Sequence, residues 1–328
     1  MSERDNRPTW SGSRRHYEVW FATMSDGRTG YWIRTTVHGG PEPHARVWFA
    51  RFDRENPSRI VALNRRVPME AWATEPDAVE VRAGGVVFAS GRLHGAIEGS
   101  GHRAEWDLSF PTGGPTYRLL PGPLYRGRLA PTKPLSPNVD TDFTGSVTVD
   151  GQTTSVEWMP GQQGHLHGRA HADRWAWAHC SAFQGEGSEG TVVHALAAQG
   201  RRGPITTPFT TFVGVRWRNR WLRFTRVSRR RDTALGVWRI DLSNDRYRLT
   251  GAVAGDPALM VQARYEDPDG APRWCHNTEV GSSRFVLFER AELGWDDVAD
   301  LTSEGTTHAE WAGRTPAPGT FAPHLDVG

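Results

Sequence analysis

Residues 161–180 contain the densest group of side chains able to do chemistry. This segment carries four histidines and two tryptophans, which are His165, His167, His171, His179, Trp175 and Trp177. Imidazole titrates near neutral pH, so it can both donate and accept a proton. An indole face stabilises positive charge. These residue types predict the wall of a cavity that holds a flat or apolar molecule, with titratable groups at its rim. The alternative is that the tryptophans are core residues and that the Gly-His run is an ordinary turn.

Acid-initiated chemistry on such a molecule needs a proton donor in an apolar pocket, where desolvation shifts the pKa of a carboxyl group or an imidazole. The candidate acids are His165, His167, Asp173, Glu157, His276 and Glu279. The last two belong to a polar run, residues 274–279, which is unusual in a strand next to tryptophan. Buried polar groups need partners, so the alternative is that His276, Asn277 and Glu279 form a structural network that closes a barrel.

We therefore predict two sets of site residues. The catalytic set is His165, His167 and Glu279. The ligand-binding set is Trp158, Trp175, Trp177, His179, Trp274 and His276.

A metal site is the weaker interpretation of the histidines. His165, His167, His171 and His179 could bind zinc or another transition metal. However, no cysteine or carboxylate completes a recognised ligand spacing. The sequence also lacks the His-Glu-x-x-His, Gly-x-Ser-x-Gly and P-loop motifs. The glycine-rich run at residues 185–190 is an acidic turn that would repel phosphate. We expect no metal and no cofactor.

The elements that position these residues read almost entirely as strands. Residues 174–183 alternate large and small side chains, and this period of two predicts a strand with Trp175, Trp177 and His179 on one face. The preceding residues are interrupted by glycine and predict a loop. Short strands separated by turn signals such as Asp-Gly recur along the chain, which favours antiparallel barrels or sandwiches. Only residues 68–74 and 291–300 are expected to hold short helices.

One proline-rich stretch, residues 120–137, suggests a division of the chain. Proline removes ladder donors, so this stretch predicts an extended connector between two units. We place the boundary near Ser136, giving an N-terminal β domain over residues 1–135 and a C-terminal β domain over residues 136–328. Residues 91–95 and 164–168 share a short Leu-His-Gly-containing pattern, as two copies of one topology would.

The overall composition excludes several classes of protein. The formal net charge is only +2, so no nucleic-acid partner is expected. Cys180 and Cys275 are expected to be buried free thiols. The polar N-terminus predicts no signal peptide, and no apolar run is long enough to span a bilayer, so the expected location is cytoplasmic. Three arginines at residues 229–231 are expected to form a solvated hairpin tip, or otherwise an anion or membrane-surface patch.

The chain resembles the lipocalin-like double-domain proteins. This group includes carotenoid 1,2-hydratase (hydroxyneurosporene synthase), tocopherol cyclase, the AttH-type proteins and lipocalin-like Diels–Alderases. The resemblance rests on residues 17–20 (Tyr-Glu-Val-Trp), 30–35 (Gly-Tyr-Trp-Ile-Arg-Thr), 46–50 (Arg-Val-Trp-Phe-Ala) and 105–108 (Glu-Trp-Asp-Leu), followed by the proline connector and residues 145–151 and 164–180.

The resemblance implies an all-β fold of two calycin-type antiparallel barrels with an apolar cavity between or inside them. His165 matches the family histidine, whereas His167 stands where the family has a tryptophan. Two functions follow as hypotheses. The first is hydration or cyclisation of an isoprenoid, polyene or polyketide-like molecule, by acid–base catalysis or by binding the substrate in a folded form. The second is a non-catalytic carrier of lipids or a stress-related binding protein.

Overall fold

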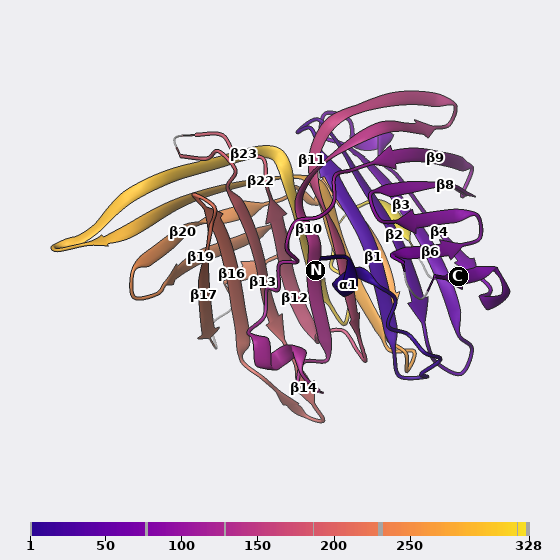
Figure 1. The fold of residues 1–328 in the computed structure, drawn as a ribbon, viewed down its shortest axis with the longest axis horizontal. Coiled ribbons are helices and arrows are strands. Elements are labelled where there is room, and N and C mark those ends of the chain that lie inside the picture. Colours follow the sequence, from indigo (N-terminus) through magenta and orange to yellow (C-terminus); the bar gives the residue numbers. More distant parts are fainter. Residues whose placement is uncertain are drawn as a thin grey trace.

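The structure is a computed structural model that describes residues 2–75, 78–127, 129–185, 187–228, 232–319 and 321–325. Most of the described chain forms two antiparallel 11-stranded sheets that lie side by side (Figure 1). The predicted all-β fold is confirmed. We refer to the two large sheets as the first and second sheets, in chain order.

The first sheet has the strand order β4-β3-β2-β1-β11-β10-β9-β8-β7-β6-β5. Its strands are β1 (Tyr17–Ser25), β2 (Thr29–His38), β3 (His44–Asp53), β4 (Val61–Val67), β5 (Trp72–Thr74), β6 (Glu80–Ala83), β7 (Val86–Ala89), β8 (Arg92–Gly99), β9 (His102–Ser109), β10 (Thr132–Val149) and β11 (Gln152–Gly168).

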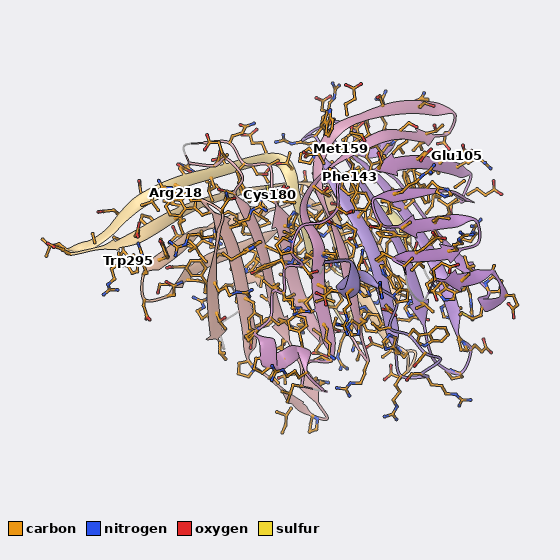
Figure 2. The ribbon with its side chains drawn as sticks, viewed as in Figure 1. Glu105, Phe143, Met159, Cys180, Arg218 and Trp295 are labelled. Atoms are coloured by element: carbon orange, nitrogen blue, oxygen red, sulfur yellow. The ribbon has the colours of Figure 1, made fainter. Side chains whose placement is uncertain are left out.

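The second sheet has the order β17-β16-β13-β12-β23-β22-β20-β19-β18, with β21 paired to β22 and β24 paired to β21 in the one parallel pairing of the described strands. Its strands are β12 (Arg174–Cys180), β13 (Val192–Gln199), β16 (Phe209–Trp217), β17 (Arg220–Ser228), β18 (Thr233–Ala234), β19 (Val237–Ser243), β20 (Tyr247–Ala254), β21 (Val261–Glu266), β22 (Pro272–Ala291), β23 (Gly294–Gly313) and β24 (Ala322–Leu325). The β22–β23 hairpin projects beyond the body of the molecule, with Trp295 near its tip (Figure 2).

The remaining elements are short. They are helix α1 (Ser2–Asn6), the two-stranded ribbon β14 (Arg201–Arg202) and β15 (Ile205–Thr206), and 3-10 turns at Pro57–Arg59, Met69–Ala71, Gly122–Tyr125 and Pro257–Leu259.

Each sheet curls around its own hydrophobic core. In β1, Trp20, Ala22 and Met24 face the core of the first sheet, whereas the alternate residues Tyr17 and Phe21 face the second sheet. This alternation follows from the period of two in a strand. β1 therefore buries apolar side chains on both of its faces, and it lies in the middle of the molecule.

The large rings of β12 lie in the contact between the two sheets. The predicted strand is confirmed, with β12 covering Arg174–Cys180. The small residues Ala176 and Ala178 face the core of the second sheet. Trp177 on the other face packs with Phe21 of β1, their ring centroids being 5.3 Å apart. We call this contact, in which β1 and β2 face β12, β22 and β23, the inter-sheet seam.

The predicted loop before this strand is wrong, because residues 161–168 belong to β11, which pairs with β1. The glycines reflect close packing. A Cβ atom on Gly164 would lie 2.1 Å from a ring carbon of Phe21, so only glycine lets this ring cross the strand.

Of the two predicted short helices, the one at residues 68–74 is present only as a 3-10 helix over Met69–Ala71, which the strand β5 follows. The one at residues 291–300 is wrong. Residues 291–300 lie in the β22–β23 hairpin, where Ala291 pairs with Gly294. A short polar stretch forms a hairpin turn when the residues on either side of it pair as strands. The local sequence pattern alone does not show whether they pair.

Strand pairing assigns β10 and β11 to the first sheet, so the chain passes to the second sheet between Gly168 and Arg174. The division at residue 135 stays a prediction about domains. Pro134 and Pro137 lie within β10, and the register of β10 shifts between Leu135 and Asn138. A bulge of this kind accommodates residues that donate no ladder hydrogen bond.

Three further predictions concern the cysteines, membrane-spanning segments and the arginines at residues 229–231. Cys180 and Cys275 are buried free thiols, as predicted. Within the described residues, no helix has the length and apolar character needed to cross a membrane. The arginines at residues 229–231 lie outside the described residues.

Candidate functional site

A buried group of two carboxylates and one imidazole lies in the inter-sheet seam. His308 on β23 faces Glu279 on β22, with 2.5 Å between Nδ1 and Oε1. The other ring nitrogen, Nε2, lies 3.7 Å from Oε1 of Glu310. All three side chains are almost fully buried. Residues 308 and 310 face the seam together because they are two apart on one strand. We call these three residues the seam triad.

The seam triad carries strongly perturbed charges. Burial alone would lower the pKa of His308, but the charges of Glu279 and Glu310 outweigh it and raise this pKa to about 9. Burial raises the pKa of Glu279. Burial would also raise the pKa of Glu310, but its contacts with His308 and Trp175 lower it overall. At neutral pH His308 is therefore an imidazolium between two carboxyl groups, of which Glu279 takes up a proton more readily.

The two predicted tryptophans of β12 contact this triad. The Trp175 indole donates a hydrogen bond from Nε1 to Oε2 of Glu310, over 3.1 Å. The Trp177 ring centroid lies 4.4 Å from that of His308. An aromatic ring close to a cation stabilises it, so the Trp177 indole helps to hold His308 in its charged form.

Two more imidazoles lie beside the triad. His179 and His194 are 3.2 Å apart through their Nδ1 atoms, and Trp177 Nε1 donates to Nε2 of His194. Burial lowers the pKa of His194 to about 3 and that of His179 well below its ordinary value. Both rings are neutral at neutral pH, so His308 is the charged imidazole of this group.

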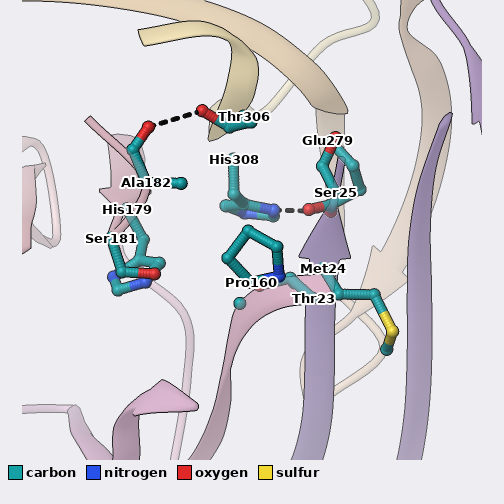
Figure 3. A pocket seen from close by; sticks show the side chains of 11 residues that line it. Thr23, Met24, Ser25, Pro160, His179, Ser181, Ala182, Glu279, Thr306 and His308 are labelled. Carbon is teal, nitrogen blue, oxygen red and sulfur yellow. Dashed lines mark hydrogen bonds and ion pairs between the residues drawn. The ribbon is translucent and has the colours of Figure 1, made fainter. Parts of the chain in front are cut away.

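A pocket of about 240 Å³, counting its open mouth, reaches the triad from outside. Glu279 and His308 line it together with His179, and apolar side chains of Met24, Pro160 and Ala182 complete much of the wall (Figure 3). Trp175 and Trp177 are not among its lining residues. The space inside it that a water-sized molecule can enter is only about 10 Å³, room for about one water molecule. A ligand would have to open this pocket further to reach the triad.

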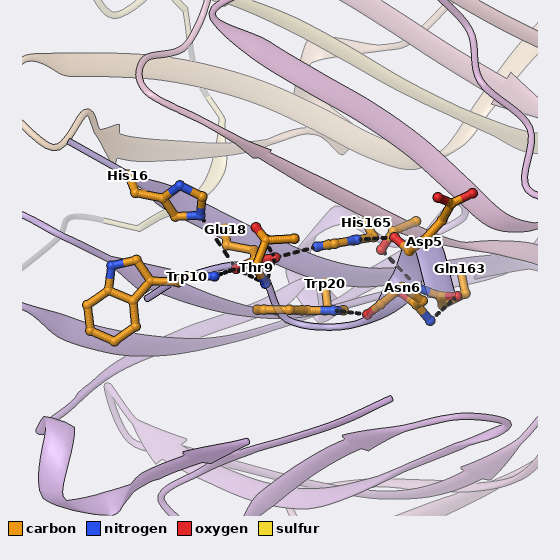
Figure 4. Close-up of polar contacts among 10 residues, drawn as sticks. Asp5, Asn6, Thr9, Trp10, His16, Glu18, Trp20, Gln163 and His165 are labelled. Atoms are coloured by element: carbon orange, nitrogen blue, oxygen red, sulfur yellow. Dashed lines mark hydrogen bonds and ion pairs between the residues drawn. The ribbon is translucent and has the colours of Figure 1, made fainter. Parts of the chain in front are cut away.

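His165 belongs to a second polar cluster, inside the first sheet. Its Nε2 lies 2.8 Å from Oε1 of Glu18, and its Nδ1 lies 2.7 Å from the backbone carbonyl of Asp5. The ring stacks on Trp20 with centroids 4.9 Å apart. Neither His165 nor Glu18 is exposed, and Figure 4 shows both beneath the N-terminal segment.

The N-terminal segment closes this cluster. Glu18 accepts hydrogen bonds from the backbone amides of Thr9 and Trp10 and lies 3.5 Å from His16. Burial would raise the pKa of Glu18, but these contacts and His165 hold it well below its usual range. His167, on the same strand as His165, has its pKa lowered to about 4 by burial. The cluster ties the N-terminus to the sheet.

The other predicted residues are dispersed. Trp158 lies within β11, where the register against β10 shifts, and is 68% exposed. Trp274 is half-buried, and His276 bonds to Gln262 and to the Trp311 carbonyl. Of the other candidates, Asp173 pairs with Arg314, Glu157 is exposed, and His171 pairs with Asp267 at 2.7 Å.

Sequence reasoning missed His308, Glu310 and Glu18. The signal for the first two was available, because residues 307–311 alternate in the manner of a strand with one polar face.

No group of three or more histidine, cysteine, aspartate or glutamate side chains within the described ranges is arranged to hold a metal ion. The four histidines of residues 161–180 lie instead in three environments. His165 and His167 stack near Glu18, His171 lies at Asp267 and His179 at His194.

Two curled antiparallel sheets in tandem, joined across a seam with a buried acid–base group, define a double lipocalin-like β protein. The tocopherol cyclase-like family model matches residues 140–313, more than half of the chain. This protein belongs to the tocopherol cyclase-like family.

Three individual proteins are similar to this chain over nearly its whole length. Rv0493c and MT0513, uncharacterized proteins from two strains of Mycobacterium tuberculosis, are each 29% identical over 98% of this chain and 92% of their own length. The crystal structure of the AttH-like protein NE1406 from Nitrosomonas europaea covers 92% of both chains with a TM-score of 0.51 and 13% identity. The last similarity supports the fold alone.

Proposed function

We propose that this protein binds an apolar, unsaturated small molecule at the inter-sheet seam and promotes its hydration or cyclisation by proton transfer from Glu279. The observation that carries the proposal is the seam triad, in which two buried carboxyl groups share one imidazolium at the end of a partly apolar pocket. Membership of the tocopherol cyclase-like family agrees with a cyclisation.

The charge balance of the triad favours Glu279 as the acid. With His308 protonated and both carboxyl groups ionised, the triad carries one net negative charge. Binding an apolar ligand removes water and favours the neutral form, and the raised pKa of Glu279 directs the added proton there. The hydrogen bond with His308 uses Oε1, which leaves Oε2 to carry that proton toward the pocket.

The reaction needs no oxidant or reductant. The Glu279 proton is transferred to one carbon of an alkene, and the other carbon becomes cationic. Water, or a hydroxyl of the same molecule, then forms a bond to that carbon and returns a proton to the Glu279 carboxylate. The product gains one water in the first case and is an isomer in the second. His308 acts as a positioning residue that also strengthens the acid.

Unsatisfied polar atoms support a ligand with at least one polar group. Nε2 of His308 and both amide atoms of Asn277 are buried and have no hydrogen-bond partner within the described residues. Asn277 pairs with Glu310 in the ladder. Because buried polar groups are nearly always paired, these atoms favour a hydroxyl or carbonyl on the bound molecule, or ordered water in its absence.

Deuterium labelling tests the proposal. The wild-type protein, Glu279→Gln and the control Glu98→Gln, whose side chain is 70% exposed, are incubated in D₂O with a total lipid extract of the source organism, and products are analysed by mass spectrometry. We expect a hydrated or isomerised lipid with one carbon-bound deuterium from the wild type and the control. In Glu279→Gln, which lacks the acid, the amount of this deuterated product should fall about a hundredfold or more.

The carrier hypothesis makes the opposite prediction. If lipids bind to the wild type without acquiring carbon-bound deuterium, the protein is a non-catalytic carrier and the acid mechanism is wrong. If Glu279→Gln forms the product as fast as the wild type, catalysis rests on binding the substrate in a folded form.

A further inference from the structure

A second pocket of the seam is lined mainly by cationic and aromatic side chains. It has about 230 Å³ of space counting its open part, but no room for a water-sized molecule in this conformation, and is lined by Arg34, His38, His44, Arg46, Trp48, Tyr265 and Glu266. It draws on β2 and β3 of the first sheet and β21 of the second. We call it the Arg34 pocket. It shares no lining residue with the pocket at the seam triad.

Arg34 is a buried charge that makes no ion pair within the described part of the chain. Only 6% of its surface is exposed, and its Nε has no hydrogen-bond partner there. The guanidinium lies 4.2 Å from the ring centroid of Tyr265, and the ring of Trp48 is 5.9 Å away. Ring faces offset part of the desolvation cost of a cation, but a buried charge without a counter-ion remains unfavourable.

The remaining groups of the pocket do not supply the missing negative charge. Arg46, 3% exposed, adds a second cation and donates to Asn64. His38 and His44 stack with centroids 5.2 Å apart. The single carboxylate in the lining, Glu266, lies 3.3 Å from Arg264.

Glu310 and Asp267 also face this region from the second sheet, but each has partners of its own. Glu310 accepts from Trp175, and Asp267 pairs with His171 and Arg273.

The unpartnered atoms of the pocket are hydrogen-bond donors. Among the described residues they are Nε of Arg34, Nε1 of the Trp48 indole and the hydroxyl of Tyr265, which can also accept. A guanidinium presents its Nε–H and one Nη–H as a fork that matches two oxygens of a carboxylate or a phosphate. The indole N–H can donate only. Donors without acceptors, next to two buried arginines, favour an oxyanion.

We propose that the Arg34 pocket binds an anionic oxygen group, a carboxylate or a phosphate, through the guanidinium of Arg34. Because the lining side chains leave no room for a water-sized molecule in this conformation, the anion enters as they move apart, and it is a free small anion or the head of a longer molecule. The proposal stands apart from the acid chemistry of Glu279, and either can fail alone.

Three probes of equal chain length test it, namely hexanoate, hexyl phosphate and hexanol. Their dissociation constants are measured by calorimetry at fixed ionic strength in a buffer without carboxylate or phosphate. We expect one or both anions to bind about tenfold or more tighter than hexanol, as a hydrogen bond to a charged group allows. The ratio between the two anions identifies the preferred head group. Equal binding of all three probes would overturn the proposal.

Variants then locate the site. Arg34→Met should bring anion affinity down to that of hexanol, whereas Arg34→Lys should keep part of the preference. Arg284→Met is the matched control, because Arg284 lies on β22 outside the pocket lining with its side chain 71% exposed. Unchanged anion affinity in Arg34→Met would refute the assignment.

Melting temperatures separate binding from a structural role. Without ligand, Arg34→Met should melt at or above the wild-type temperature, because an uncompensated buried charge is removed. A lower melting temperature together with no anion preference in the wild type would make Arg34 structural.

If Arg34→Met does not fold, the wild type still decides the question. The ¹⁵Nε–H resonance of Arg34, assigned through the folded Arg34→Lys variant, should shift with the anions and not with hexanol.

Discussion

Replacing Glu279 by glutamine should lower the pKa of His308. In the wild type this pKa is about 9, because the negative charges of Glu279 and Glu310 outweigh burial. The variant removes the charge at 2.5 Å and keeps only Glu310 at 3.7 Å. In the variant, less negative charge counteracts the lowering of the His308 pKa by burial. We expect the His308 midpoint in Glu279→Gln to fall by about two pH units or more, to its ordinary range or below.

The raised pKa also has a consequence for stability. A shift from the ordinary 6.5 to about 9 corresponds to about 3 kcal/mol, since one pH unit is worth about 1.4 kcal/mol. Because the folded-state pKa is raised, this stabilisation is fully present below pH 6.5 and is lost as the pH rises through 9. The wild type should therefore lose about 3 kcal/mol of unfolding free energy between pH 6 and pH 10 through this group.

Two measurements follow this effect. Imidazole NMR titration reports the His308 midpoint, and denaturant unfolding at pH 6 and pH 10 reports the stability. In Glu279→Gln the alkaline loss attributable to His308 should disappear. Asp150→Asn is the control, because it breaks an exposed pair with His102 at 2.7 Å, and exposed pairs contribute less than about 1 kcal/mol. A wild-type midpoint near 6.5, or one that is the same in the variant, would refute the account of the triad.

Three further changes test other parts of the structure. Glu18→Gln should destabilise the protein by about 1–3 kcal/mol at pH 7. Because the pKa of Glu18 is lowered on folding, the difference from wild type should shrink as the pH falls below the carboxyl's ordinary range, and equal differences at pH 7 and pH 4 would contradict this. Gly164→Ala should cost about 1–3 kcal/mol, since its Cβ would meet Phe21 at 2.1 Å. The control Gly99→Ala, with open space at its Cβ, should change the free energy of unfolding by no more than about 0.5 kcal/mol in the same denaturation assay. Equal destabilisation by the two glycine substitutions would show that Phe21 moves aside. Trp158→Ala should change stability by less than about 0.5 kcal/mol and leave lipid binding unchanged, whereas weaker binding in a pull-down of the lipid extract would return this exposed residue to the site.

The sequence by itself determined the local features of this protein. The alternation of large and small residues at 174–180 predicted a strand with Trp175 and Trp177 on one face, and β12 has that form. The Asp-Gly pair at residues 150–151 predicted a hairpin, and both residues have the positive φ of such a turn. These features depend on backbone preference and on a period of two, which a short window of sequence contains.

Only the tertiary structure decided which side chains meet. Glu279, His308 and Trp177 come from three strands, and their contact depends on the order β12-β23-β22 and on the register that faces Asn277 to Glu310. A shift of one residue would turn His308 toward the core. The four histidines of residues 161–180, close in sequence, lie in three environments for the same reason. Strand pairing depends on residues far apart in the chain, so the spacing within one segment could not reveal it.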